Sequence, residues 1–385
     1  MATFGMLSTY PPAACGLATF CQALRDHLIA DDPGCDVGVV QVLDGAQPVS
    51  RRAEVLTTLD GAGRRTEEAA EALNRFDVVV VQHEYGIYGG PDGGRVLDVL
   101  DAVKRPVIVV LHTVLSRPSA HQREVLEQIV ERSDRVVVLS HTAGLHLTKV
   151  YGVPAERMAV IPHGARVAPV TPRGLSLGFH KPLHRPRRPT VLSWGLIGPG
   201  KGIEWAIDAV AEMRAMGTEA RYLVVGRTHP KVLEREGEAY RDSLRRRALE
   251  RGIDDLVEFD AEYEGDRRLH EIIDAADVVL LPYDSREQVT SGVLIEAVAA
   301  RRPIVATAFP HAVEMLGNGA GALVPHQDPV AMARALRQVL TVPDVVADMT
   351  AHAGVIAPTL AWSAVAHRYR MLAEDVAGAA ARLVA

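Results

Sequence analysis

Short runs of β-branched and aliphatic residues alternate with longer amphipathic stretches along almost the whole chain. Runs such as Val78–Val81 and Val107–Leu111 are apolar at every position, so both faces of each strand would have to be buried. Continuous apolar strands separated by helical stretches are typical of parallel sheets covered by helices on both sides. The alternation therefore predicts a doubly wound, Rossmann-like α/β fold.

The predicted elements form two series, and 385 residues, at about 150 residues per domain, are enough for two domains. The strands of the first series are expected at 3–7, 37–42, 77–82, 107–111, 135–140 and 159–161. Those of the second are expected at 190–194, 221–225, 257–260, 277–282, 303–306 and 322–324. The clearest helices are expected at 17–30, 204–215, 240–251, 291–300 and 329–340.

A segment rich in proline and basic residues, 169–189, separates the two series and disfavours a regular element. We therefore expect an N-terminal domain over 1–170, a linker over 171–189 and a C-terminal domain over 190–360. Ligands of such domains bind beyond the carboxyl ends of the strands, at helix N-termini. The two domains are expected to face each other across a cleft.

Composition narrows the class of protein. Apolar residues make up 48% and charged residues 23%, which is ordinary for a globular protein. Subtracting 48 acidic from 42 basic side chains leaves a net charge of −6, whereas nucleic-acid-binding proteins usually carry a basic surplus. No apolar run approaches the roughly 20 residues that span a bilayer. We expect a soluble protein that binds no nucleic acid, with peripheral membrane contact and oligomeric state left open.

The cysteines and the N-terminal residues indicate the cellular compartment in which the protein is expected. Cys15, Cys21 and Cys35 do not form a Cys-x-x-Cys pair, so a zinc or thioredoxin-type site is not expected. The N-terminus lacks the basic start and apolar core of a signal peptide. A reducing cytoplasm is the simplest expectation.

A glycine-rich loop at Gly195–Gly202 lies between a predicted strand and a predicted helix. Gly195 and Gly200-Lys201 have the spacing of a Walker A loop, but Gly202 stands where a nucleoside triphosphatase has a Ser or Thr that binds magnesium. We interpret the loop as a phosphate-binding loop without a metal, in which Lys201 faces a diphosphate. The alternative is a surface lysine that follows a turn.

Two other strand-to-helix junctions could bind an anion or a sugar ring. Thr290-Ser291-Gly292 resembles a helix start with exposed amides, and Glu296, one turn further on, could accept hydrogen bonds from a ribose diol. Gly16, in the first loop, would let the backbone approach an anion closely. A plain turn and a solvated glutamate are the structural alternatives.

Histidines end two neighbouring strands of the first series. His83-Glu84-Tyr85 follows one of these strands and His112-Thr113 follows the next. Lone histidines are usually structural, but two at corresponding strand ends favour a ligand-binding role. We therefore expect His83, Glu84 and Tyr85 to face a ligand-binding site.

Taken together, these motifs resemble those of retaining glycosyltransferases of family 4, the group 1 glycosyltransferases, which have the GT-B fold. Val160-Ile161-Pro162-His163-Gly164 is similar to the segment before the linker of that family, and Gly200-Lys201-Gly202 to its Lys-Gly loop. Leu223–Gly226, followed by Arg227, matches a strand that ends in glycine. His112 resembles the histidine that lies near the transferred sugar. The resemblance covers nearly the whole chain.

The chain departs from the family pattern at two positions. The second acid of the paired-glutamate signature is Glu296, but the position of the first is occupied by Gln288, and Glu287 lies one residue too early. The arginine expected five residues before the lysine is Leu196. These departures leave two questions open: which sugar the donor carries, and how completely the protein binds the diphosphate.

The resemblance implies metal-independent transfer of a sugar, with retention, from a nucleoside-diphosphate sugar to a hydroxyl of a sugar, lipid or metabolite, without a cofactor. The N-terminal domain would bind the acceptor, with His83, Glu84 and Tyr85 on the acceptor side, and the C-terminal domain would bind the nucleotide. A helix over 361–385 would pack back on the first domain. His112, Lys201, Glu287 and Gln288 are the catalytic candidates. The donor-binding candidates are Gly16, Gly200, Lys201, Arg227, Thr290, Ser291, Gly292 and Glu296.

Other functions remain as alternatives. A P-loop nucleotide hydrolase is disfavoured by Gly202. A nicotinamide dehydrogenase would need a Gly-x-Gly-x-x-Gly loop after a strand, which the sequence lacks. A protein that binds a nucleotide sugar without turning it over is compatible with Gln288 and Leu196, and an epimerase of similar architecture is conceivable.

Overall fold

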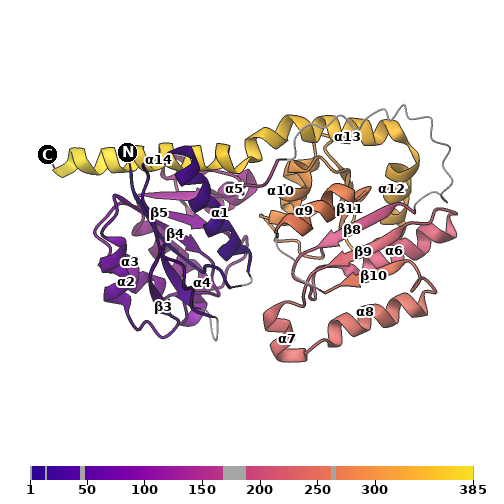
Figure 1. Ribbon diagram of the computed structural model, residues 1–385, viewed down its shortest axis with the longest axis horizontal. Coiled ribbons are helices and arrows are strands. Elements are labelled where there is room, and N and C mark those ends of the chain that lie inside the picture. Colours follow the sequence, from indigo (N-terminus) through magenta and orange to yellow (C-terminus); the bar gives the residue numbers. More distant parts are fainter. Residues whose placement is uncertain (1, 14, 44–47, 168–187, 262–265, 385) are drawn as a thin grey trace. The chain divides into compact units, whose positions relative to one another are not determined.

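The computed structural model describes residues 2–13, 15–43, 48–167, 188–261 and 266–384 (Figure 1). The chain divides into two compact units, one formed by Met1–Ala165 with Thr359–Ala385 and the other by Arg166–Pro358. Most of the expected linker, up to residue 187, lies outside the described residues. Both units are α/β.

The first unit contains a parallel sheet of seven strands in the order β3-β2-β1-β4-β5-β6-β7. Its strands are β1 Phe4–Ser8, β2 Val37–Leu43, β3 Val55–Asp60, β4 Val78–His83, β5 Val107–Leu111, β6 Arg135–Val138 and β7 Met158–Val160. Its helices are α1 Gly16–Asp31, α2 Thr66–Leu73, α3 Val96–Ala102, α4 Ala120–Glu131, α5 His141–Tyr151 and α14 Trp362–Val384, with short 3-10 turns at η1 Pro91–Gly93 and η2 Ala155–Arg157.

The second unit contains a parallel sheet of six strands in the order β10-β9-β8-β11-β12-β13. Its strands are β8 Thr190–Trp194, β9 Arg221–Val225, β10 Val257–Asp260, β11 Val278–Leu281, β12 Ile304–Thr307 and β13 Ala322–Val324. Its helices are α6 Ile203–Ala215, α7 Pro230–Glu236, α8 Ala239–Glu250, α9 Asp266–Ala275, α10 Gly292–Ala299, α11 Pro310–Leu316, α12 Pro329–Thr341 and α13 Pro343–Ile356, and η3 Ala357–Leu360 leads to the first unit.

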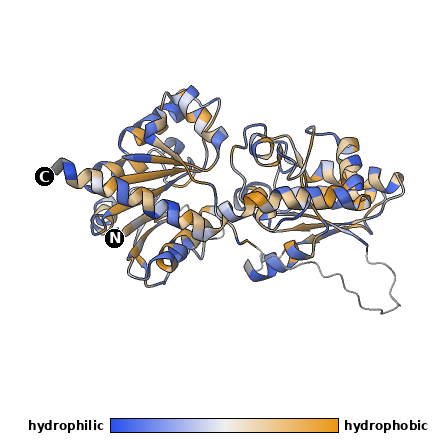
Figure 2. Cartoon of the chain, turned by 90° about the horizontal axis from the view of Figure 1, so that it is seen from above, coloured by the Kyte–Doolittle hydropathy of each residue, from blue (hydrophilic) through white to orange (hydrophobic). Residues whose placement is uncertain are grey.

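Burial explains why these segments form strands. Residues of β1, β4, β5, β8 and β11 are buried at every position, as the apolar runs predict. The strands are mostly apolar in Figure 2, whereas the helices carry both apolar and polar residues. Each sheet therefore lies between amphipathic helices, and the expectation of two parallel-sheet domains is confirmed.

One strand has no counterpart among the predicted elements. β3 lies at the edge of the first sheet, pairs only with β2 among the described strands, and is only partly buried. Because an edge strand needs only one apolar face, its sequence, Val-Leu-Thr-Thr-Leu-Asp, lacks the continuous apolar run by which the other strands were recognised.

The C-terminal helix α14 belongs to the first unit and packs on α1. The Ala165 amide donates to Leu360 O at 2.7 Å, and the Trp362 amide donates to Ala165 O at 3.3 Å. The Trp362 ring lies edge-on to Phe20, with ring centroids 5.2 Å apart. A Cβ on Gly164 would lie 2.2 Å from the Trp362 ring, so glycine is what allows this close packing.

Within the described residues, no single helix has the length and apolar character to cross a membrane. One bent pair, 329–341 with 343–360, passes that test only when its two helices are taken together.

We predict that Gly164→Ala lowers the free energy of unfolding by about 1–3 kcal/mol, because the added methyl overpacks the contact with Trp362. The matched control is Gly378→Ala, whose Cβ would approach only Arg382 Nη1, at 3.9 Å. This control should be neutral or stabilising, since alanine favours a helix. Urea denaturation checks both variants, and equal stability of the two would contradict the packing argument.

Candidate functional site

The glycine loop follows β8 at the carboxyl edge of the second sheet. It is held to the loop after β9 by two hydrogen bonds: the Ile197 amide donates to Arg227 O at 2.8 Å, and the His229 amide donates to Ile197 O at 2.8 Å. Lys201 lies at the end of the glycine loop, just before α6 begins. The loop is therefore placed where ligands of doubly wound sheets bind.

Two glycines let the backbone of neighbouring strand ends come close together. Gly226 has φ of +136°, and a Cβ there would lie 2.0 Å from Gly195 O. Gly202 has φ of +68°, and a Cβ there would lie 1.8 Å from Pro282 O. No serine or threonine fits at position 202, so the loop cannot supply the hydroxyl that a P-loop hydrolase uses to bind magnesium.

Lys201 presents its ammonium group over an aromatic ring. Its Nζ lies 4.5 Å from the centroid of the Tyr283 ring, which stacks on Phe309 with centroids 5.1 Å apart. Among the described residues no carboxylate forms an ion pair with this ammonium group. A cation held by a ring face, without a neutralising acid, is suited to bind an anion.

The start of α10 lies beside this loop. A Cβ on Gly195 would approach Val293 Cγ2 at 3.5 Å, and the Trp194 indole donates from Nε1 to Glu296 Oε2 at 2.9 Å. The structure thus brings together most of the predicted donor-binding positions: Gly200, Lys201, Arg227, Thr290, Ser291, Gly292 and Glu296. Arg227 is exposed, immediately after Gly226.

Contacts within the segment before α10 correct part of the prediction. The Ser291 amide, expected to face the diphosphate, instead donates to His311 Nδ1 at 2.9 Å. The Gln288 side chain donates from Nε2 to Thr290 O at 2.7 Å, and Glu287 is exposed. Since the Ser291 hydroxyl accepts from the Leu294 amide, the amides of Gly292 and Val293 are the ones without an intrahelical acceptor.

In the first unit, His112 is fixed by a side chain of the neighbouring strand. Its Nε2 lies 2.7 Å from Gln82 Oε1, an amide oxygen that accepts, so Nε2 carries the proton. Burial, together with the proximity of His163 and His83, lowers the pKa of His112 to about 3. The imidazole is therefore neutral at physiological pH.

His83, predicted on the acceptor side, lies inside the protein. Its side chain is fully buried at the end of β4, and burial lowers its pKa to about 4. Glu84 links the ends of β4 and β5, because one of its carboxylate oxygens accepts from Thr113 Oγ1 at 2.6 Å. Tyr85 is half-buried against His83, and Gly16 is exposed at the start of α1.

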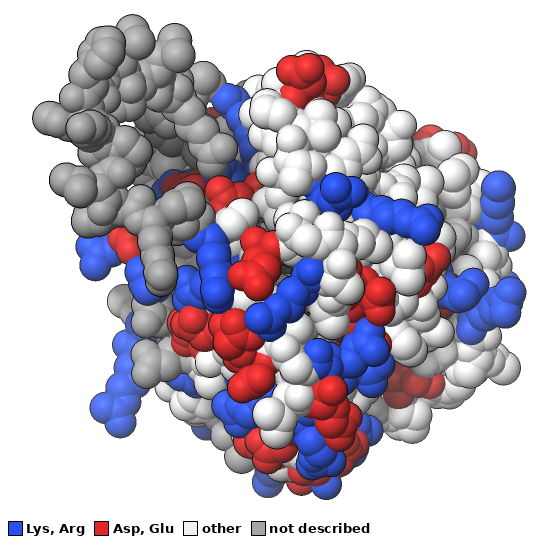
Figure 3. Space-filling view, turned by 90° about the vertical axis from the view of Figure 1, so that its right-hand side faces the viewer, with Lys and Arg blue, Asp and Glu red and all other residues white. Residues whose placement is uncertain are grey.

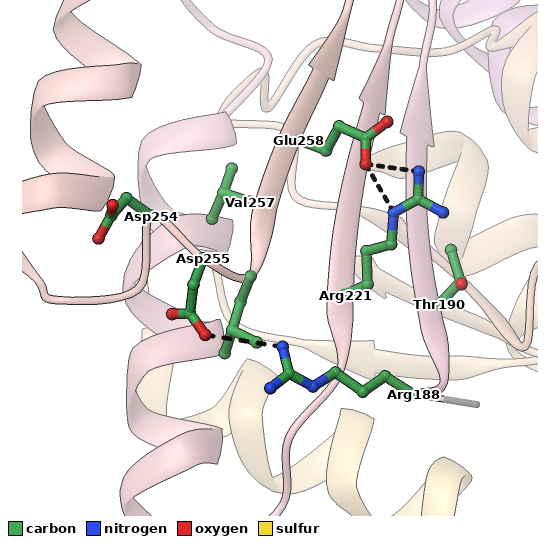
Figure 4. A pocket seen from close by; sticks show the side chains of 8 residues that line it. Arg188, Thr190, Arg221, Asp254, Asp255, Val257 and Glu258 are labelled. Atoms are coloured by element: carbon green, nitrogen blue, oxygen red, sulfur yellow. Dashed lines mark hydrogen bonds and ion pairs between the residues drawn. The ribbon is translucent and has the colours of Figure 1, made fainter. Parts of the chain in front are cut away.

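A hollow lies at the opposite, amino edge of the second sheet (Figure 4). Both of its arginines are paired with acids: Arg221 Nε donates to Glu258 Oε2 at 2.9 Å, and Arg188 Nη1 lies 3.6 Å from Asp255 Oδ2. These arginines are neutralised by acids, so we do not assign the hollow as the site. The face of the protein in Figure 3 likewise carries intermixed acidic and basic side chains.

Several residues at the site were missed in the sequence analysis. Trp194 is the last residue of β8, and Tyr283 lies just after β11. Their positions at strand ends could have marked both as candidate site residues. His311 could not have been found in this way, because it contacts Ser291, at the start of α10, from the separate helix α11. Among the described residues, no group of three or more His, Cys, Asp or Glu side chains is arranged to hold a metal ion.

We predict that the stability of the protein falls as the pH drops from 6.5 to 4, in part through His83. Because its pKa is about 4 when folded and near 6.5 when unfolded, the unfolded chain binds more protons in that window. His83→Leu removes this difference and should reduce the slope of unfolding free energy against pH by up to ~1.4 kcal/mol per unit. Urea denaturation between pH 4.5 and 6 measures the slope, and an unchanged slope would refute the assignment.

Two family models match the chain. A family model described as Glycosyltransferase Family 4 matches residues 16–168, and one described as Glycosyl transferases group 1 matches residues 188–342. A D-inositol 3-phosphate glycosyltransferase of Kineococcus radiotolerans is 28% identical over 341 residues, 82% of this chain and 76% of that protein. One of Nocardia farcinica is 31% identical over 192 residues, 49% of this chain and 41% of that protein.

Solved structures share the fold over nearly the whole chain. Sucrose-phosphate synthase of Thermosynechococcus elongatus matches with a TM-score of 0.75 and 20% identity, covering 98% of this chain and all of that one. Anabaena Alr3699/HepE, solved in complex with UDP, matches with a TM-score of 0.73 and 16% identity, covering 97% and 100%. With the GT-B fold and a family match on each unit, the chain belongs to family 4 of the glycosyltransferases, the group 1 glycosyltransferases.

Proposed function

We propose that this protein transfers a sugar from a nucleoside-diphosphate sugar to an acceptor hydroxyl, with retention of configuration and without a divalent cation or cofactor. The observation that carries the proposal is the Lys201 ammonium group, which lies over Tyr283 without an acidic partner among the described residues, in a loop beside the start of α10. The solved neighbour in complex with UDP supports a nucleoside diphosphate as part of the ligand.

The chemistry requires positive charge where the sugar–phosphate bond breaks, because negative charge develops on the departing diphosphate. A lysine about 4 Å from a phosphate oxygen gains ~4 kcal/mol at an effective dielectric constant near 20, before desolvation is counted. Fixed amides, such as those of Gly292 and Val293, add to this stabilisation without needing to reorganise. Together these groups supply the charge that a metal ion provides in other transferases.

We assign the recognition of the ribose to Glu296. The Trp194 indole holds one of its carboxylate oxygens at the edge of the glycine loop. A carboxylate has two oxygen acceptors, and these match the two hydroxyl donors of a vicinal diol such as that of a ribose. Gln288 cannot ionise, so contact between this position and the sugar would involve a neutral amide.

His112 is assigned to the transferred sugar. Since its Nε2 proton is directed at Gln82, its Nδ1 offers a lone pair to a sugar hydroxyl. With a pKa of about 3, it acts as a neutral hydrogen-bonding group and not as a general acid. The acceptor hydroxyl is then deprotonated by the departing phosphate. The names of the relatives make D-inositol 3-phosphate the first acceptor to test.

A binding protein that does not turn its ligand over is the second candidate, since Gln288 and Leu196 replace charged residues of the family pattern. Thermal unfolding with UDP-, GDP- and ADP-sugars identifies the donor that raises the melting temperature. Turnover of that donor with an acceptor then separates the transferase from the binding protein.

We predict that Lys201→Ala reduces transfer by about 100-fold, equivalent to ~3 kcal/mol of lost transition-state stabilisation. Steady-state assays with the donor identified above measure the loss. The control is Lys149→Ala, which removes an exposed lysine of α5 and should leave the rate unchanged. Near-normal activity of Lys201→Ala would contradict the assigned role.

We also predict that the glycosidic bond of the product keeps the anomeric configuration of the donor, because the acceptor attacks on the face that the diphosphate leaves. Proton NMR of the product, recorded with EDTA present throughout the reaction, measures the configuration. An inverted product would overturn the retaining mechanism, and loss of turnover in EDTA would overturn metal independence.

A further inference from the structure

His311 holds the segment before α10 at two points. It is 1% exposed and lies in the first turn of α11. Its Nδ1 accepts from the Ser291 amide at 2.9 Å, and its own amide donates to Gln288 O at 3.2 Å. One residue thus fixes both ends of the four-residue stretch from 288 to 291.

The contact requires an acceptor inside the protein. The Ser291 amide is buried, and a buried N–H without an acceptor is unfavourable. The lone pair on Nδ1 satisfies it, so the ring is the tautomer whose Nδ1 carries no proton. An apolar side chain of similar size would fill the same space but leave the amide without an acceptor.

The orientation of α10 depends on this stretch. Ser291 is the N-cap of the helix, and its hydroxyl accepts from the Leu294 amide at 3.2 Å. The next two amides, those of Gly292 and Val293, are the ones assigned above to the diphosphate. A shift of Ser291 would therefore redirect these two donors and move Glu296, one turn further along the helix.

We propose that His311 is a positioning residue for the donor: its Nδ1 holds the Ser291 amide, and this sets the direction of the diphosphate-binding amides at the start of α10. The inference rests on the proposed function, in which those amides bind the diphosphate. It adds a residue that contacts the segment 288–291 before α10 and does not contact the sugar donor itself.

The test compares two substitutions in the full-length protein. His311→Asn keeps an acceptor close to the position of Nδ1, whereas His311→Leu keeps the volume and removes the acceptor. Hydrogen–deuterium exchange of a peptide covering 286–294 measures the contact without any ligand. Calorimetric titration with UDP, or with the nucleoside diphosphate of the donor found by thermal unfolding, measures the consequence for binding.

We expect His311→Leu to speed exchange in 286–294 and to weaken nucleotide binding, each by at least tenfold, while peptides from β8 and β9 exchange as in the wild type. His311→Asn should stay within threefold of the wild type in both measurements. A purely structural role would instead lower the melting temperature and leave the dissociation constant unchanged.

Unchanged exchange and unchanged binding in a folded His311→Leu variant would overturn the inference, and so would equal losses in the Leu and Asn variants. If the Leu variant does not fold, His311→Gln, whose oxygen lies one bond further from the backbone, takes its place with the same expected losses. A wild-type protein that binds no nucleoside diphosphate would contradict the proposed function, while the exchange experiment would still decide whether His311 holds the segment.

Discussion

The close approach of backbone at three strand ends is the constraint on which the donor site depends. Gly226 lies against the carbonyl of Gly195, and Gly202 lies against the carbonyl of Pro282, at separations that leave no room for a Cβ. These contacts join the ends of β8, β9 and β11 and fix where Lys201 leaves the loop. Glycine at position 202 therefore serves packing, which explains why a loop so close to a Walker sequence lacks the metal-binding hydroxyl.

Electrostatic preorganisation follows from that packing. The Lys201 ammonium group is held over Tyr283. Trp194, the last residue of β8, orients Glu296, which lies 102 residues further along the chain. The helix start that follows Ser291 adds amides beside the same loop. Positive charge and hydrogen-bond donors are thus fixed before a ligand arrives, which is the condition under which they stabilise a developing anion most effectively.

Local patterns made the fold predictable, since strands buried on both faces read as apolar runs and helices as amphipathic stretches. The edge strand β3 was not predicted, because it is only partly buried and its sequence therefore has no continuous apolar run. The site was predictable only as far as position along a strand determines it. That rule placed Lys201 and His112 beyond the carboxyl ends of strands, where the structure has them, but it did not reveal that His83 is fully buried. The contact of His311 with Ser291 joins residues 20 apart through tertiary packing, and no sequence period encodes it.

The central claim is that a diphosphate binds between the side chain of Lys201 and the first amides of α10. A crystal structure of the protein with an intact nucleoside-diphosphate sugar tests it most directly. The account predicts phosphate oxygens within hydrogen-bonding distance of Lys201 Nζ and of the Gly292 or Val293 amide, with the ribose at Glu296. A diphosphate bound elsewhere, for example at Arg188 and Arg221 on the amino edge of the sheet, would contradict the account.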